Sequence, residues 1–160
     1  MSHVSTPRDV PDLSLDRVAF ARLSDGRVVA RGTFDSVGYV RPGGRLTALN
    51  GTASLEPEAG TGFASWGTVR VEAPTTSGEL SAQRFTASGG VRMNAARGDS
   101  AATERVHYDG IRGSIESDTP IDAKGPGYQV HGNGLFARAD GTSIALTGGV
   151  KGTLQMEASP

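Results

Sequence analysis

The strongest constraint on this fold is a short pattern that the chain repeats. In FARADGTSIALTGGV, which begins at Phe136, an aromatic residue precedes a polar turn, an alternating apolar run and a glycine. The stretches YVRPGGRLTALNGTA, from Tyr39, and YDGIRGSIESDTPI, from Tyr108, repeat this order, with Leu46 and Ile115 each seven residues after the ring. Alternating runs bounded by glycine predict antiparallel strands joined in a meander, one hairpin per repeat.

Composition favours a folded, all-β chain. The 160 residues contain 23 glycines and 8 prolines, and apolar residues are spread between them rather than concentrated. The alanine-rich part from Ala95 to Thr103, the best candidate for a helix, is interrupted by Gly98. We therefore predict a single domain of antiparallel β-strands joined as a meander, with roughly 11 to 14 short strands.

The chain divides into a short leader and one domain. Residues 1–12 are polar and contain two prolines, which predicts a disordered leader or linker stub. Residues 13–157 carry the strand signals and form the predicted domain. In its first strand, Leu13 and Leu15 share one phase while Val18 and Phe20 share the other, which predicts a bulge near Asp16.

Charge and cysteine content exclude several functions. The net charge is −1, with both signs interspersed along the chain, so no basic stripe is available to follow a phosphate backbone and nucleic acid is not an expected partner. The absence of cysteine excludes disulfides, thiol chemistry and cysteine-based zinc sites. The sequence contains no run of 18 apolar residues, so this chain is not expected to span a membrane with a helix.

The motifs that suggest chemistry all have simpler explanations. His107, Asp109 and His131 could share a metal only if distant strands were adjacent. The string GNGLFA at Gly132 resembles a dinucleotide-binding fingerprint, but a strand pattern follows it where a helix is required. The string GDS at Gly98 lies in a predicted turn. We predict no catalytic residue, no metal and no cofactor.

An apolar inner face runs along most of the predicted strands. It contains Phe20, Phe34, Leu46, Val69, Val71, Phe85, Val91, Met93, Val106, Ile115, Ile121, Val130, Ile144, Leu146 and Val150.

Such a face has two interpretations. An ordinary sandwich core requires the same alternation of apolar residues. Several opposing positions are small, however, and large residues that face small ones leave a groove, which fits an acyl chain. These small positions are Ala30, Gly32, Ala48, Ala53, Ala87, Ala95, Ala123 and Ala137.

Four stretches together resemble a known family. They are PDLSLDRVAFARLSDGRVVARG, YVRPGGRLTALNG, RFTASGGVRMNAARGDSAATERVHYDG and GPGYQVHGNGLFARADGTSIALTGGV, and they cover nearly all of residues 11–154. The chain thereby resembles the periplasmic domain of LptC, the lipopolysaccharide-export protein, and the wider OstA-like β-jellyroll family. The shared features are structural glycines and alternating strands rather than a catalytic signature.

The resemblance implies the fold, a single antiparallel β-jellyroll of two packed, splayed sheets, and it implies transport without catalysis. Lipid A acyl chains would lie in the apolar groove and pass to the next jellyroll, and a partner ABC transporter in the inner membrane would supply the energy. The implied partners are therefore lipopolysaccharide, neighbouring jellyroll proteins of the export bridge and that transporter. The implied location is the periplasm, with an inner-membrane anchor in the full-length protein that this chain does not contain.

Unpaired edge strands are the predicted docking sites for those neighbours, because a free edge can pair with a strand from another protein. The candidate residues are Leu13, Leu15 and Val18 in the first strand and Val150, Lys151, Thr153 and Leu154 in the last.

Two alternatives remain open. The chain could be a self-associating structural β protein with a filled core and no ligand. It could also be a carbohydrate-binding jellyroll, which requires exposed aromatic residues, and only Trp66, Phe63 and Tyr39 could serve.

Overall fold

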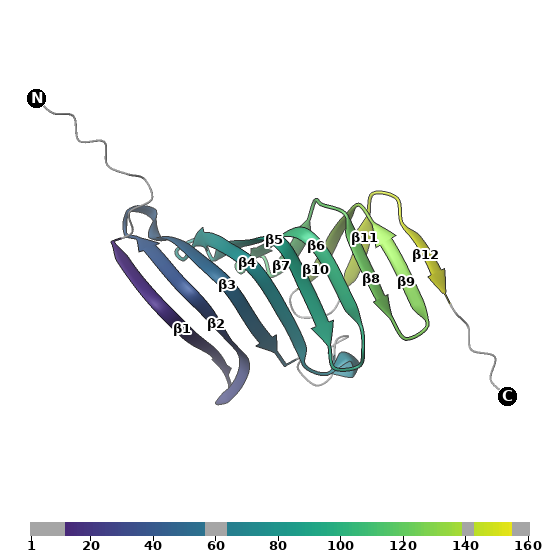
Figure 1. Cartoon of the computed structure of the whole chain (residues 1–160), viewed down its shortest axis with the longest axis horizontal. Helices are drawn as coiled ribbons and strands as arrows, with labels where there is room; N and C mark the ends of the chain where they lie inside the picture. The colour runs from purple at the N-terminus through teal and green to yellow at the C-terminus, as the bar shows by residue number, and fades with distance from the viewer. Residues whose placement is uncertain (1–11, 57–63, 139–142, 155–160) are drawn as a thin grey trace, which may run out of the picture.

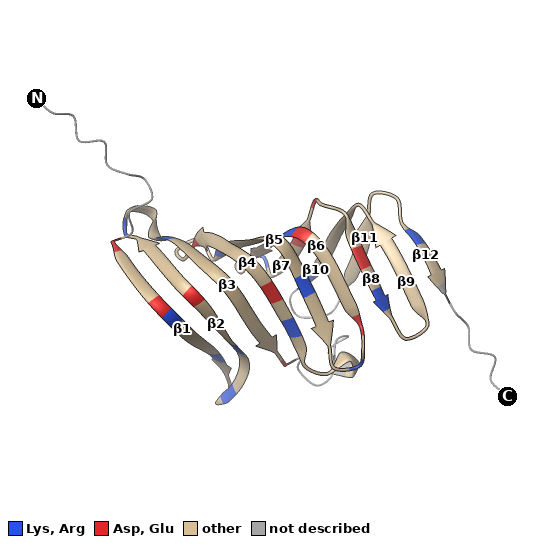
Figure 2. Ribbon diagram, viewed as in Figure 1, with Lys and Arg blue, Asp and Glu red and all other residues tan. Residues whose placement is uncertain are grey.

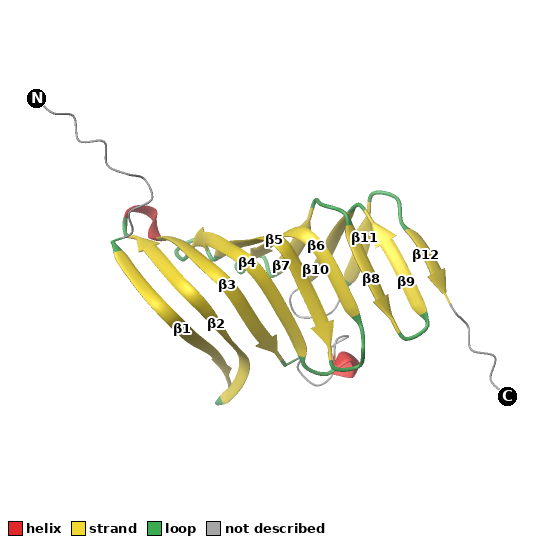
Figure 3. Ribbon diagram, viewed as in Figure 1, coloured by secondary structure: helices red, strands yellow, loops and turns green. Residues whose placement is uncertain are grey.

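The all-β prediction is confirmed. The computed structural model describes residues 12–56, 64–138 and 143–154, which form twelve strands and two three-residue 3-10 helices (Figures 1 and 3). All twelve strands belong to one antiparallel sheet. Phe63 and the C-terminal residues after Leu154 lie outside the described part of the chain.

The strands are short at the C-terminal end and long at the N-terminal end. Their bounds, with those of the two 3-10 helices, are β1 Leu13–Ser24, β2 Arg27–Val40, η1 Pro42–Gly44, β3 Arg45–Leu55, η2 Ala64–Trp66, β4 Val69–Glu79, β5 Arg84–Ala95, β6 Ser100–Asp109, β7 Ser114–Ser117, β8 Ile121–Gly125, β9 Tyr128–Gly132, β10 Gly134–Arg138, β11 Ile144–Thr147 and β12 Lys151–Leu154.

The sheet divides at β6. Strands β1 to β6 pair in sequence order, and β6 then pairs with β7 through His107–Asp109 and with β8 through Ser100–Thr103. One branch continues as β7, β10 and β11, and the other continues as β8, β9 and β12.

A crease crosses the long strands β1 to β6 and continues between the two branches. Arg17 and Asn50 have left-handed backbone angles in the middle of β1 and β3, with φ of 54° and 52°. Pro74 and the pair Gly89–Gly90 interrupt the pairing of β4 with β5.

Further along the chain the crease becomes a complete break. Residues 118–120 separate β7 from β8, Asn133 separates β9 from β10, and residues 148–150 separate β11 from β12. We call the half of the sheet that contains β7, β10 and β11 the first wing, and the half that contains β8, β9 and β12 the second wing. The two splayed sheets expected from the sequence correspond to these wings, which are hydrogen-bonded into one sheet through β1 to β6.

The crease inverts the alternation of side chains. On β6, Ala101 in the second wing lines the same pocket as Ile144 in the first wing. In the first wing Tyr108 lies opposite Ile115, Ile115 opposite Ala137, and Ala137 opposite Ile144. These residues form one row across the strands, which we call a transverse row, and their side chains lie on the same face of the sheet. Ala101 and Tyr108 therefore share the inner face although one position is odd and the other even. An unbroken strand would place them on opposite faces.

The irregularity expected near Asp16 has a different form. The register of β1 with β2 is continuous from Asp16 to Val18, and the register shift lies between Arg22 and Leu23. The phase change of the first strand occurs instead at Arg17, through its positive φ. A left-handed residue reverses the alternation without adding a residue to the ladder, which the sequence pattern alone does not distinguish from a bulge.

The repeated hairpins align into one transverse row. Tyr39 pairs with Leu46 and Tyr108 with Ile115, as the repeat predicts. In the C-terminal copy Ile144 pairs with Ala137, so Phe136 faces the opposite side of the sheet. In this copy of the repeat Ile144 follows the ring by eight residues, whereas Leu46 and Ile115 follow theirs by seven. The extra residue turns Phe136 to the opposite face.

Aromatic rings on the inner face lie over glycines of neighbouring strands. A Cβ atom at Gly51 would be 2.5 Å from the ring of Phe34, and one at Gly32 would be 2.5 Å from the ring of Phe20. Gly51, which the sequence pattern placed at a strand boundary, lies within β3 because this ring covers it. The rings of Phe20 and Phe34 also stack on each other at 5.4 Å, so they lie along the sheet rather than standing across it.

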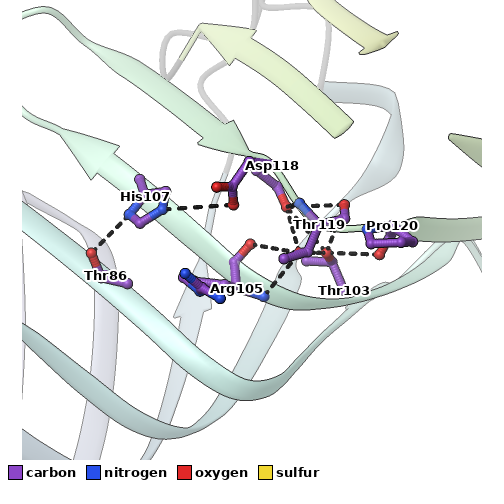
Figure 4. A network of polar contacts seen from close by, with 8 residues as sticks. Thr86, Thr103, Arg105, His107, Asp118, Thr119 and Pro120 are labelled. Carbon is purple, nitrogen blue, oxygen red and sulfur yellow. Dashed lines mark hydrogen bonds and ion pairs between the residues drawn. The ribbon is translucent and has the colours of Figure 1, made fainter. Parts of the chain in front are cut away.

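A polar network fills the point where β6 changes partner (Figure 4). Thr119 accepts a hydrogen bond from the backbone N–H of Arg105 and donates one to its carbonyl oxygen, at 3.2 and 3.3 Å. Thr103 and Ser117 are both buried and bond to each other and to Thr119. The Thr119 hydroxyl thus replaces the strand pairing that the Arg105 backbone lacks on the edge of β6 that faces β7 and β8.

We expect Thr119→Val to lower the free energy of unfolding by about 1–2 kcal/mol, because it removes the partner of two backbone groups at a nearly constant volume. Urea denaturation measures this. Thr47→Val, at an exposed position on β3, is the matched control and should change stability by less than about 0.5 kcal/mol. Equal effects of the two substitutions would contradict a role of Thr119 in supporting the junction.

Candidate ligand-binding trough

The inner faces of the two wings form an apolar trough that runs across the strands. In the first wing one transverse row consists of Leu13, Tyr39, Leu46, Gly78, Phe85, Tyr108, Ile115, Ala137 and Ile144. In the second wing a corresponding row consists of Phe20, Gly32, Ala53, Val71, Met93, Ala101, Ala123, Val130 and Gly152.

The structure brings the predicted inner-face residues together, with one exception. All of them except Val150 lie in strands, on the trough side of the sheet. Val150 lies in the connection between β11 and β12 and is 51% exposed. Its place after Gly148 and Gly149, both with positive φ, puts it at the crease rather than in the last strand.

The trough is not filled by its own side chains. Among the described residues, no large side chain is fully buried. The buried apolar residues are mostly small: Ala30, Ala48, Val69, Ala73, Val91, Ile121 and Ala137. Protein interiors are normally packed as densely as organic crystals, so a sheet that leaves Phe20 37% exposed on its inner face has an unoccupied apolar surface.

The outer face has the opposite character. One of its transverse rows alternates in charge through Arg45, Glu79, Arg84 and Asp109 on consecutive strands. Figure 2 shows basic and acidic residues interspersed along the strands. Arg84 lies 3.5 Å from Asp109. Hydrogen bonds from the backbone N–H groups of Arg112 and Ile111 lower the pKa of Asp109. A surface of this kind is stable in water, so the two faces of the sheet differ sharply in polarity.

The trough narrows to a pocket of about 60 Å³ between the wings in the C-terminal half. Leu135, Ile144 and Leu146 line it from the first wing, and Met93 and Ile121 from the second. Three alanines add small apolar walls: Ala95, Ala101 and Ala123. Four further residues complete the lining, and we call them the mouth residues: Trp66, Asp99, Ser100 and Tyr128.

Asp99 is the centre of a cluster at this mouth. It is buried and accepts hydrogen bonds from Arg97 at both oxygens, at 2.6 and 2.9 Å. The Tyr128 hydroxyl donates a third bond to it. The guanidinium of Arg97 lies 5.6 Å from the centre of the Trp66 ring, and the backbone N–H of Arg97 donates to the carbonyl of Trp66. The cluster thus joins three turns of the second wing.

The cluster shifts the pKa values of its members. The hydrogen bonds from Arg97 lower the pKa of Asp99, against the opposing effect of burial. Burial, and then the hydrogen bond to Asp99, raise the pKa of Tyr128 to about 12. At neutral pH the cluster therefore holds one carboxylate, one guanidinium and one neutral phenol.

These shifts predict a pH dependence of stability. Neutral Tyr128 stabilises the fold fully below pH 10.0, its ordinary pKa, and this contribution is lost as the pH rises through about 12. We expect the stability difference between wild type and Tyr128→Phe to shrink over this range. Unfolding by guanidinium at a series of pH values measures it, with Tyr39→Phe as the control. A difference that stays constant up to pH 12 would contradict the role of the Tyr128 hydroxyl.

The sequence alone does not predict this cluster. Its GDS string at Gly98 predicts only a turn, and that turn is present, since Gly98 has a φ of 113° between β5 and β6. The one available signal was a pair of opposite charges two residues apart, Arg97 and Asp99, in a turn. The partner Tyr128 is 29 residues away in the chain, so no local pattern could identify it.

The two histidines of the described residues, His107 and His131, have separate polar partners. His107 bonds to Thr86 on β5 and lies 3.9 Å from Asp118, whereas His131 bonds to Asp122 on β8. Within the described part of the chain, no group of three or more His, Asp or Glu side chains is positioned to hold a metal ion.

The predicted docking strands are edges of the sheet. In the described residues β1 pairs only with β2, and β12 only with β9. Leu13, Leu15 and Val18 belong to β1, and Lys151, Thr153 and Leu154 to β12, while Val150 precedes β12. No helix of the described residues is long and apolar enough to cross a membrane.

An open, creased antiparallel sheet with an unfilled apolar inner face defines the class of the OstA-like β-jellyroll proteins. In agreement, the sequence profile of the family described as "Lipopolysaccharide-assembly, LptC-related" matches residues 66–155, more than half of the chain. The chain belongs to this LptC-related family. The family consists of transport components of lipopolysaccharide assembly rather than enzymes.

A solved structure supports the fold independently. The chain is similar to LptH, the LptA-homologous periplasmic component of the lipopolysaccharide transport device of Pseudomonas aeruginosa, with a TM-score of 0.54 and 10% sequence identity. The match covers 79% of this chain and 95% of that one. A comparison with curated protein sequences found no match.

Proposed function

We propose that the trough binds the acyl chains of lipid A and passes the lipid to the next jellyroll of the export bridge. Family membership supports a role in lipopolysaccharide transport as a periplasmic bridge component. The observation that carries the finer proposal is the unfilled inner face, where no large side chain of the described residues is fully buried. The alternative of a ligand-free structural protein requires a filled core, so this observation favours a bound ligand.

The energetics favour a continuous trough over a single deep cavity. Each methylene exposed to water costs about 0.8 kcal/mol, so several acyl chains cannot cross an aqueous compartment unshielded. A trough that runs across all strands from β1 to β12 keeps the chains covered while they move. The chain carries no phosphate-binding loop, so an ATP-hydrolysing transporter in the inner membrane would drive the movement.

The trough predicts face-specific contact with lipid. We expect a photocrosslinking residue at Phe85 to label lipopolysaccharide in cells, and one at the neighbouring Arg84 to label it at least roughly tenfold less. The reason is that adjacent residues of a strand point to opposite faces, so Arg84 lies on the charged outer face. Crosslinked lipid is detected by immunoblotting. Equal labelling at both positions would contradict an interior path.

We propose further that β1 and β12 are the docking edges for neighbouring jellyrolls and that the full-length protein is anchored to the inner membrane. Each strand presents one row of backbone groups without a partner in the described sheet. Lys151 on β12 is exposed, and a lysine on an edge discourages unselective pairing while permitting a selected partner. Strand addition at both ends would join the troughs of successive proteins into one path.

The edge at β12 can be tested by removing one backbone donor. We expect Thr153→Pro to weaken binding of the next bridge protein by about 1 kcal/mol or more and to leave the domain folded. A pull-down with the neighbouring jellyroll measures binding, and circular dichroism checks the fold. Thr153→Ala, which keeps the backbone N–H, is the control and should bind normally. Normal folding with undiminished binding of the proline variant would exclude this edge as the docking site.

A further inference from the structure

A second pocket, of about 200 Å³, lies on the face of the first wing that is opposite to the trough. Phe85 and Tyr108 belong to the trough row, so the residues before and after them in β5 and β6 direct their side chains to the outer face. The pocket, which we call the outer pocket, lies between two rows of such residues. Its lining consists of Arg84, Asp109 and Ser114 in one row, Thr86, His107 and Glu116 in the other, Phe85 and Tyr108 between the rows, and Arg112 from the turn between β6 and β7.

Ser114 offers this pocket a polar group that the protein itself does not use. The residue is only 5% exposed, and within the described part of the chain its hydroxyl makes no hydrogen bond. Buried hydroxyl groups normally have a partner, as those of Thr103 and Ser117 do. Since no buried side-chain nitrogen or oxygen of the described residues lacks a partner, the Ser114 hydroxyl opens to solvent, and it does so at the outer pocket.

The charges around the outer pocket are arranged as a dipole. Arg84 and Arg112 lie beside Asp109, whose carboxylate accepts two backbone hydrogen bonds and lies 3.5 Å from Arg84. Two guanidinium groups against one carboxylate leave an excess positive charge at this end. Glu116 lies in the other row, about 7 Å from Ser114 along β7, and it makes no ion pair with another described residue.

The neighbours of Glu116 are held by their own contacts. The Thr86 hydroxyl and His107 Nδ1 are hydrogen-bonded at 2.9 Å, and His107 Nε2 lies 3.9 Å from Asp118 (Figure 4). Glu116 is therefore the carboxylate available at this end of the pocket. A simple anion would be repelled by Glu116, and a simple cation would be repelled by the guanidinium groups of the other row.

We propose that the outer pocket binds a small dipolar organic ion, in which a short carbon chain separates an ammonium group from a carboxylate. The ligand carboxylate contacts Arg84 and Arg112, its ammonium group contacts Glu116, and the Ser114 hydroxyl bonds to it between these ends. Charge-assisted hydrogen bonds at both ends select a ligand that carries both charges. This site lies on the opposite face from the trough, so the inference goes beyond the proposed function and does not depend on lipid binding.

Three probes that share one carbon chain test the requirement for both charges: γ-aminobutyrate, butyrate and butylamine. Each is titrated into the isotope-labelled chain while the backbone amide signals are followed by NMR. We expect γ-aminobutyrate to shift the signals of Ser114 and Glu116. Its dissociation constant should be at least roughly fivefold lower than that of either other probe, because each of these lacks one charge-assisted contact.

Two variants assign the two ends of the ligand. Glu116→Gln should reduce the preference for γ-aminobutyrate over butyrate to within about twofold and keep the preference over butylamine. Arg112→Gln should have the reverse effect and lower the preference over butylamine by at least roughly threefold. Arg45→Gln, on the same face but outside the pocket, is the control and should keep both preferences. Circular dichroism confirms that each variant is folded.

Several outcomes would overturn the outer-pocket site without affecting the trough. Equal affinity for the three probes would show that the pocket does not recognise a dipole. Absence of binding, or signal shifts that leave out Ser114 and Glu116, would exclude the pocket as the site. Preferences that are unchanged in both folded pocket variants would exclude Glu116 and Arg112 as contacts of the ligand.

Discussion

The whole structure depends on one requirement, that the same face of the sheet be apolar on both sides of a crease. A straight strand would alternate its side chains without interruption, so folding the sheet without correction would place one wing with its polar face inward. The chain solves this with left-handed residues at Arg17 and Asn50, with an extra glycine in β5, and with complete breaks in the C-terminal strands. The position of this crease sets where the sheet divides into its two wings.

Folding along a crease leaves polar backbone groups without partners, and the side chains that satisfy them are local. At β6 the hydroxyls of Thr103, Ser117 and Thr119 occupy the gap between β7 and β8. These contacts let the wings separate without the cost of buried, unpaired groups, which would otherwise offset the stability of a domain with so small a core.

The trough owes its openness to the way large and small residues alternate along each transverse row. Where Phe20 lies over Gly32 and Phe34 over Gly51, the rings rest on the backbone of the neighbouring strand. Such a surface loses the burial that would stabilise an ordinary sandwich. In the proposed function a bound acyl chain would restore this burial, which would couple ligand binding to the stability of the fold.

The sequence by itself determined the strands, their hairpins and the identity of the inner face, because glycine spacing and alternation of apolar residues are local properties. It placed Leu46, Phe85, Ile115 and Leu146 on one apolar surface, and the structure agrees. It misjudged Phe136, Val150 and the first-strand irregularity, each of which depends on how a single residue shifts the phase of a strand. The crease and the cluster of Asp99 with Tyr128 were decided only by the tertiary structure, since they join residues that lie far apart in the chain and share no local pattern.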